Sequence, residues 1–401
     1  MYDLYGALIG NLSNYLYTYI LIILLVAGGI YFTVRTKFVQ FRYLKESLRV
    51  VLAPSEDDKA ISSFQALMVS TASRVGTGNI AGVSTAICLG GLGSLFWMWL
   101  TALLGMSTAF VEGTLAQIYK RRSDDGGCYG GPSYYIDQAI GKHWLGILFA
   151  VFMILTYMVG FNLVASFNIA DALRVVPGYA EHENLAKWII GAVLAVLFFI
   201  CISGGGKQIA GITEKVVPFM GFFYIAVAMF VIVTHITLLP GVFAEIFRNA
   251  FDVKAIFGGF TGSAVMLGIK RGLFSNEAGV GAAACAAGSA GVSHPVKQGL
   301  VQVLSVFLDT CMICTATAML LLCSGVEPDA DMAGMAYVQA AMNSTLGKFG
   351  VVFITVSLFL FAFTTLLGNF YYAETGLAYL CGMTPSNGAK WGMRIVAAVV
   401  V

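Results

Sequence analysis

Charged residues are scarce in this sequence. They make up 11% of its 401 residues, against roughly a quarter in ordinary soluble domains, while 58% of the residues are hydrophobic. A chain of this composition cannot cover itself with a polar surface, so the sequence indicates an integral membrane protein. The net charge of +2 is small and the basic residues are dispersed, which argues against a nucleic-acid partner.

Motifs of catalysis and of nucleotide binding are also missing. The sequence has no H-E-x-x-H, G-x-S-x-G or G-x-x-x-x-G-K-[ST] motif, so neither a hydrolase nor an ATP-driven pump is supported. The pair Gly76 and Gly78 follows no strand-like segment, which argues against a dinucleotide-binding loop. The sequence therefore predicts a protein that is not an enzyme, with an intramembrane enzyme and a channel as the rival classes.

Long apolar runs dominate what is present. Each is close to the roughly 20 residues that a helix needs to cross a bilayer. The expected spans are 15–34, 63–90, 94–119, 144–171, 187–202, 216–238, 258–290, 299–323, 350–380 and one from about 391. The first run is too long for a signal peptide and is read as a retained span. The last run is still apolar at Val401, which predicts that the chain ends inside a span and that the C-terminal part is truncated.

The basic residues predict the orientation of these spans. The loops after the odd-numbered spans hold fifteen Lys and Arg residues: Arg35, Lys37, Arg42, Lys45, Arg49, Lys59, Lys120, Arg121, Arg122, Lys142, Lys207, Lys215, Lys297, Lys390 and Arg394. The other loops hold five: Arg174, Lys187, Arg248, Lys254 and Lys348. Cytoplasmic loops carry the excess of basic residues, so we expect a multi-pass protein of the cell membrane with its N-terminus outside.

Two of the apolar runs contain a polar, glycine-rich interruption. The first, RVGTGNIAG, covers Arg74 to Gly82, and the second, GIKRGLFSNEAGVG, covers Gly268 to Gly281. Glycine weakens a helix, and backbone groups freed in lipid are costly unless protein, ion or ligand satisfies them. Close packing of helices against the glycines is the alternative, but it does not need the polar residues Asn79, Ser275, Asn276 and Glu277.

The two interruptions enter the membrane from opposite sides, which is typical of an inverted repeat. The N-terminus of a half-helix presents free N–H groups to an anionic group, and unwound carbonyls can coordinate a cation. An amino-acid carboxylate and Na⁺ would suit these two features. The sequence therefore predicts a transporter of a small solute.

The residues around both interruptions closely resemble a known family. FQALMVSTASRVGTGNIAGVSTAI (Phe64 to Ile87), GIKRGLFSNEAGVGAA (Gly268 to Ala283) and TTLLGNFYYAE (Thr364 to Glu374) resemble motifs of the alanine or glycine:cation symporters, also called sodium:alanine symporters. The resemblance runs from the first span to the chain end.

The resemblance implies an all-α leucine-transporter-like fold. A single transporter domain, 1–401, would contain two inverted five-helix repeats with discontinuous helices, at 63–238 and 258–401, behind an extra N-terminal helix at 15–34. It implies uptake of alanine or glycine driven by Na⁺, or occasionally by H⁺. No obligatory protein partner is evident.

The resemblance also implies the residues of the site. The substrate pocket would be lined by Thr77, Gly78 and Asn79 of the first break, by Ser275, Asn276 and Gly279 of the second, and by Phe161 and Asn162. The Na⁺ site would use the backbone carbonyls of Ala72 and Val75 with the hydroxyls of Thr364 and Thr365. Where many members resemble GWSYYGE, this chain reads GNFYYAE, so that Asn369 takes the place of a pocket tryptophan.

Several ionisable residues fall within or near the expected spans. They are Arg74, Glu112, Lys270, Arg271, Glu277, Asp309 and Glu374. Ionisable groups in a membrane usually face a cavity or a partner. A pair such as Lys270 or Arg271 with Asp309 would make them structural, and a role in gating or in the site is the alternative.

Overall fold

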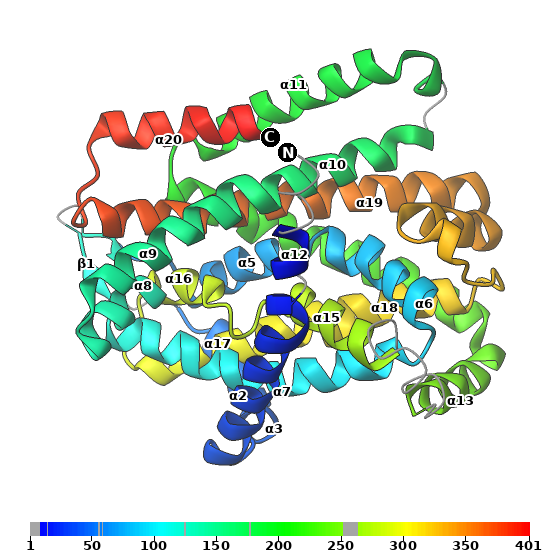
Figure 1. The fold of residues 1–401 in the computed structure, drawn as a ribbon, viewed down its shortest axis with the longest axis horizontal. Coiled ribbons are helices and arrows are strands. Elements are labelled where there is room, and N and C mark those ends of the chain that lie inside the picture. The colour runs from blue at the N-terminus through cyan, green and yellow to red at the C-terminus, as the bar shows by residue number, and fades with distance from the viewer. Residues whose placement is uncertain are drawn as a thin grey trace.

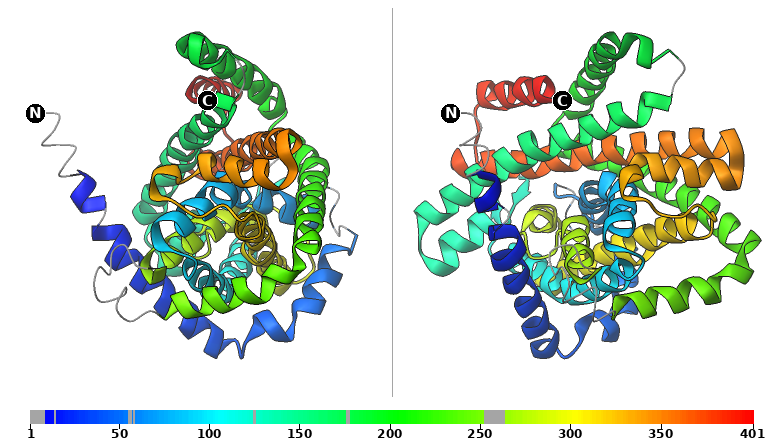
Figure 2. Two further views of the ribbon diagram at one scale, coloured as in Figure 1. Left: turned by 90° about the vertical axis from the view of Figure 1, so that its right-hand side faces the viewer. Right: turned by 45° about the vertical axis from the view of Figure 1, so that its right-hand side comes forward.

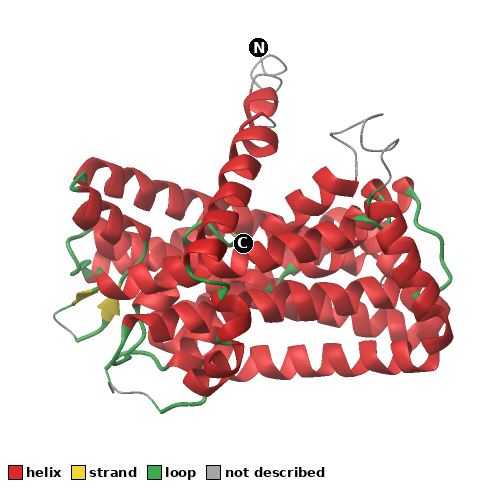
Figure 3. Cartoon of the chain, turned by 90° about the horizontal axis from the view of Figure 1, so that it is seen from below, coloured by secondary structure: helices red, strands yellow, loops and turns green. Residues whose placement is uncertain are grey.

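The chain folds into a bundle of helices (Figure 1). The computed structural model describes residues 9–13, 15–54, 57, 59–123, 126–175, 178–251 and 264–401. The first residues of the expected span 258–290, namely 258–263, lie outside this set. Figure 3 shows that helices account for nearly all of the described chain; its one small sheet pairs β1 (Arg121–Arg122) with β2 (Cys128–Tyr129) in antiparallel fashion.

Seven continuous helical segments of the described chain are long and apolar enough to cross a membrane. They are Ile9–Arg35, which contains η1 (Leu16–Leu21) and α2 (Ile22–Arg35); α7 (Ser94–Ile118); His143–Val175, which contains α9 (His143–Met153), η4 (Ile154–Phe161), α10 (Asn162–Ala172) and η5 (Leu173–Val175); α11 (Glu183–Ile202); α12 (Gly206–Thr234); Pro295–Leu322, which contains α17 (Pro295–Val306), η9 (Phe307–Cys314) and α18 (Thr315–Leu322); and α19 (Met335–Leu380). The expectation of an all-helical, multi-pass membrane protein is confirmed.

Shorter helices connect or flank these segments. They are α3 (Val39–Arg42), α4 (Leu44–Val51), α8 (Pro132–Tyr135), η3 (Ile136–Ile140), η6 (Ala180–His182), η7 (Ile236–Leu238), α13 (Leu239–Ala250), η10 (Ala330–Met332) and α20 (Asn387–Val400). Two long helices differ from the expected bounds. Helix α12 begins at Gly206, ten residues before the expected 216. The apolar pattern missed these first turns because they carry polar residues such as Lys207. Helix α19 bends at Gly347, whose φ of 60° and ψ of −148° are not helical, so the expected span 350–380 is its second part.

Both expected interruptions are real breaks. The first lies between α5 (Ser63–Arg74) and the half-helix formed by η2 (Gly78–Gly82) and α6 (Val83–Gly90). The second lies between α15 (Ala264–Asn276) and α16 (Ala282–Gly288). Its left-handed residues are Glu277, Gly279 and Gly281, with φ of 50°, 94° and 89°. This break is shorter than expected, because Gly268 to Asn276 form regular helix.

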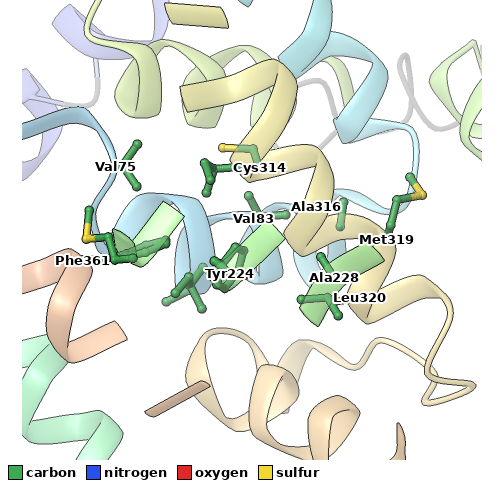
Figure 4. Close-up of a cluster of buried hydrophobic side chains, with 14 of the residues drawn as sticks. Val75, Val83, Tyr224, Ala228, Cys314, Ala316, Met319, Leu320 and Phe361 are labelled. Atoms are coloured by element: carbon green, nitrogen blue, oxygen red, sulfur yellow. The ribbon is translucent and has the colours of Figure 1, made fainter. Parts of the chain in front are cut away.

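The broken segments lie inside the bundle. Helix α15 packs on α7, and α5 packs on α12, α17 and α19. Figure 2 shows α2 and α11 at the periphery, where large apolar side chains such as Trp188 and Ile200 are exposed, as suits contact with lipid. Figure 4 shows Val75 of the first break among buried apolar side chains that include Tyr224, Cys314 and Phe361.

Candidate functional site

A small cavity lies where the two helix breaks meet. Its volume is about 40 Å³, and it is lined by Ser73, Arg74, Gly76, Thr77, Gly78, Phe161, Val164, Ala165, Phe274, Ser275, Glu277 and Thr365. Five residues expected in the substrate or cation site are therefore brought together here: Thr77, Gly78, Phe161, Ser275 and Thr365. These residues come from four segments of the chain that are far apart in sequence.

The first break leaves backbone N–H groups beside this cavity. Val75 ends α5 with a non-helical ψ of 86°, and the side-chain Oδ1 of Asn79 accepts a hydrogen bond from the Gly76 N–H at 2.9 Å. The next half-helix starts at Thr77 and Gly78, and the first N–H groups of a helix have no acceptor within it. Asn79 itself is fully buried and is not part of the cavity wall, so its role is to hold the break in shape.

A buried carboxylate on η9 binds both breaks. Asp309 Oδ1 accepts a hydrogen bond from Asn79 Nδ2 at 2.6 Å, and its Oδ2 accepts one from Ser275 Oγ at 3.0 Å and one from Thr310 Oγ1 at 2.7 Å. None of the ion pairs among the described residues joins Asp309 to Lys270 or Arg271. The pairing considered from the sequence is therefore not formed, because hydroxyl and amide donors surround the carboxylate instead.

The second break turns most of its polar groups away from the cavity. Asn276 Oδ1 accepts a hydrogen bond from the Ala278 N–H at 3.0 Å, and the Gly279 N–H donates to Glu112 Oε2 of α7 at 3.1 Å. A side chain at Gly279 would collide with Leu25 of α2. Asn276 and Gly279 therefore shape the break and its contact with α7, and only Ser275 of the three expected residues lines the cavity.

Two aromatic rings form one wall. Phe161 of η4 and Phe274 of α15 meet edge to face, with ring centroids 5.6 Å apart. A Cβ added at Gly78 would lie 3.5 Å from Phe274, in ordinary van der Waals contact. The space over the first break is therefore narrow and bounded by an apolar surface.

The expected residues Asn162 and Asn369 lie behind the cavity, in a hydrogen-bonded row. Ser73 Oγ donates to Asn369 Oδ1 at 2.9 Å, and Asn369 Nδ2 donates to Asn162 Oδ1 at 3.0 Å. The neighbouring Gly368 lets α19 approach the main chain of α5, since a Cβ there would lie 2.7 Å from Ser73 N. Of this row only Ser73 lines the cavity.

The residues expected around a cation are brought together in part. Thr365 Oγ1 lies 3.1 Å from the Ala72 carbonyl oxygen and 3.5 Å from that of Ser73. Thr364 Oγ1 instead bonds to the Leu360 carbonyl of its own helix at 3.0 Å and faces Met220 Sδ at 3.6 Å. The Val75 side chain belongs to the apolar core. Oxygen atoms of Ala72, Ser73 and Thr365 thus form the nearest group of hard donors.

Two ionisable residues, Arg74 and Glu277, lie in the cavity wall, as the alternative of a role in the site had allowed. Arg74 is 3% exposed; its Nη1 donates to Gln302 Oε1 at 3.1 Å, while Nε and Nη2 have no hydrogen-bond partner among the described residues. Glu277, from the other break, has its Oε2 3.4 Å from Ser73 Oγ. Their position next to the interruptions was the available signal, because each directly flanks the point where a helix ends.

Comparison with known proteins shows the family of this chain. Residues 2–401 match the model of the sodium:alanine symporter family. The chain is 45% identical to the amino-acid carrier protein AlsT of Bacillus subtilis, over 95% of this chain and 80% of that protein. It is 44% identical to the probable sodium/glutamine symporter GlnT of the same organism, over 93% and 77%. It is 37% identical to the sodium/alanine symporter AgcS of Methanococcus maripaludis, over 94% and 84%. The chain therefore belongs to the sodium:alanine symporter family.

Proposed function

We propose that the protein takes up a small neutral amino acid, alanine or glycine, together with Na⁺. The observation that carries the proposal is one cavity that holds both the free start of a half-helix and a group of oxygen donors. Membership of a symporter family supports Na⁺ as the coupling ion and a transporter rather than an enzyme.

The substrate carboxylate binds the N–H groups at Thr77 and Gly78. These groups carry the partial positive charge of a helix N-terminus, which favours an anion. The ammonium group needs acceptors, which the Ser275 hydroxyl and the Glu277 carboxylate supply from the other break. Asn79, Asn276 and Gly279 act by shaping the breaks, and Asn162 and Asn369 act from the row behind them.

The cavity size favours the smallest amino acids. A volume of about 40 Å³ is room for only about three or four water molecules, since each needs roughly 10–15 Å³. Phe161 and Phe274 limit any side chain on the substrate. Glycine and alanine require the least expansion of this space.

Na⁺ binds between α5 and α19. Thr365 and the carbonyl of Ala72 are the proposed first ligands, and the carbonyl of Val75, next to the break, completes the set from α5. Thr364 becomes a ligand only when its side chain turns away from Met220. All of these donors are oxygen atoms, which a hard cation prefers.

Transport proceeds by alternating access in a leucine-transporter-like fold. The repeats are 63–238 and 258–401, each with its break in its first membrane segment, and 15–34 is the extra helix. We place the N-terminus outside and the protein in the cell membrane. Two observations support this arrangement. Each break lies in the first membrane segment of its repeat, and most Lys and Arg residues lie in the loops that we assign to the cytoplasm.

The test is uptake into proteoliposomes that contain the purified protein. An inward Na⁺ gradient should accumulate labelled alanine or glycine, and replacing Na⁺ with choline should abolish accumulation. Uptake that persists in choline and follows an imposed proton gradient would instead establish H⁺ coupling; a relative from Bacillus sp. PS3 is named a sodium/proton-dependent alanine carrier protein. A competition panel that includes glutamine, serine and D-alanine then defines the substrate.

A further inference from the structure

A second, larger cavity is lined by residues from the start of α12 and from α19 and α20. Its volume is about 280 Å³, and its wall includes four basic side chains, Lys59, Lys207, Lys390 and Arg394, but only one carboxylate, that of Glu374. It shares no lining residue with the cavity at the helix breaks. Glu374 is nine residues beyond Thr365 on α19, a separation of roughly 14 Å along the helix.

The arginine of this cavity is buried and incompletely paired. Arg394 is 8% exposed, and its Nε has no hydrogen-bond partner in the described part of the chain. Its Nη2 lies 3.8 Å from Glu374 Oε1, which is longer than a hydrogen bond, and the guanidinium stacks 5.2 Å from the Trp391 ring centroid. A buried guanidinium nitrogen without an acceptor is costly, so this position favours an additional anion.

The other cations of the wall are also unmatched. Within the described ranges, neither Lys207 nor Lys390 forms an ion pair, and the single acid Glu374 is already next to Arg394. The Lys59 N–H donates a hydrogen bond to the carboxylate of Asp57 at 3.0 Å, so acidic charge lies next to this lysine and the inference does not depend on it. The wall therefore carries positive charge in excess of the carboxylate it contains.

The backbone near the start of α12 also favours an anion in this cavity. The 29-residue helix α12 starts at the cavity, where Gly204, Gly205 and Gly206 line the wall. Gly205 has a φ of 70°, and a Cβ there would lie 3.1 Å from both Arg394 Nη2 and Glu374 Oε1. The turn therefore brings the N-terminus of α12 close to the cationic side chains, although the Gly206 N–H already donates a hydrogen bond to the Glu374 carboxylate.

From these observations we propose that the cavity between α12, α19 and α20 binds a phosphate oxyanion. One source is the headgroup of an anionic phospholipid: the wall helix α20 exposes Trp391 and Ile395, and the basic loops predict this end to be cytoplasmic. Basic pockets between membrane helices on that side bind anionic headgroups. The other source is a soluble phosphate compound. Neither depends on the proposed transport cycle.

The experiment measures equilibrium binding to the delipidated full-length protein in neutral detergent. The probes are labelled phosphatidylglycerol, phosphatidylcholine and inorganic phosphate. The variants are Lys207→Gln with Lys390→Gln and, separately, Arg394→Gln. Lys215→Gln is the matched control, because Lys215 lies on α12, is exposed and does not line the cavity.

We expect phosphatidylglycerol to bind, with about tenfold weaker affinity in the double lysine variant and unchanged affinity in the control. Lack of competition by inorganic phosphate identifies the lipid headgroup as the ligand, and competition identifies a soluble phosphate. The proposal is overturned if neither anion binds, if phosphatidylcholine binds equally well, or if the double lysine variant binds like the control. The two lysine side chains are at least partly exposed, so we expect the double lysine variant to fold. Its binding result therefore tests the proposal even if Arg394→Gln misfolds.

Discussion

The amide Nδ2 of Asn79 lies 2.6 Å from Oδ1 of Asp309, while the other carboxylate oxygen accepts a hydrogen bond from Ser275. One acidic side chain thus fixes a residue of each helix break. The carboxylate does not line the cavity, so Asp309 is a positioning residue. Its effect on the substrate passes through the shape of the two breaks.

Replacing Asp309 with alanine should weaken binding of alanine by about tenfold or more, because three buried donors, those of Asn79, Ser275 and Thr310, lose the carboxylate they share. Asp309→Asn keeps one acceptor oxygen and should recover part of the affinity. Binding can be measured by scintillation proximity on purified protein. If Asp309→Ala and Asp309→Asn were equally impaired, charge rather than positioning would be the function of this residue.

The neighbouring threonines of α19 make a matched pair. Thr365→Val removes the hydroxyl 3.1 Å from the Ala72 carbonyl and should raise the Na⁺ concentration for half-maximal uptake by about tenfold. Thr364→Val removes a hydroxyl that faces Met220 and should have a small effect. The reverse order of effects would place the cation on Thr364. Sodium titration of alanine uptake gives both values.

Gly78 should control substrate size. Gly78→Ala places a methyl group 3.5 Å from Phe274, which the fold accommodates, but it takes space from a cavity of about 40 Å³. We expect kcat/KM for alanine to fall about tenfold more than that for glycine, because one methyl group in a tight pocket is worth about 1–3 kcal/mol.

Gly76→Ala serves as the comparison for this change. Its methyl group would collide with Thr365 Oγ1, so both substrates should lose uptake to a similar extent. Equal loss of alanine and glycine uptake in Gly78→Ala would contradict the proposed substrate position.

The orientation of the bundle can be tested with single cysteines in a cysteine-free background. Glu327 and Lys142 are both exposed and lie in loops predicted on opposite sides of the membrane. A membrane-impermeant maleimide should label Glu327→Cys in intact cells and Lys142→Cys only after permeabilisation. Labelling of Lys142→Cys in intact cells would reverse the proposed topology.

The sequence predicted both breaks because polar, glycine-rich residues are costly in an apolar run, but it overestimated the second one. Gly268 and Gly272 sit in regular helix against α7: a Cβ at Gly268 would lie 2.7 Å from Trp97 Cβ, and one at Gly272 would lie 3.1 Å from Met98 Cα. For these two glycines, close packing of helices was the right alternative. Sequence alone does not distinguish a glycine that interrupts a helix from a glycine that lets a second helix pack closely against it.

The direction in which each polar side chain points was the less predictable part of the site. Ser275 and Asn276 are adjacent in sequence, yet Ser275 lines the cavity and Asn276 packs toward α7. Adjacent residues of a helix point in directions about 100° apart. The packing of the helices around α15 therefore decides which of the two side chains faces the cavity. Asp309 had a visible signal, since an acid inside an apolar run needs partners, but two of its three partners, Asn79 and Ser275, are more than 30 residues away in the sequence.

The contact of Gly368 with the main chain of Ser73 limits how a passage can open between α5 and α19. Two backbones in direct contact leave no side chain whose rotation would create a channel there. An exit on this side requires one whole segment to withdraw from the other, breaking the hydrogen bonds of Ser73 and Asn369 together. We therefore expect the rate of turnover to follow collective helix motions of microseconds to milliseconds or slower, instead of the nanosecond hopping of single rotamers.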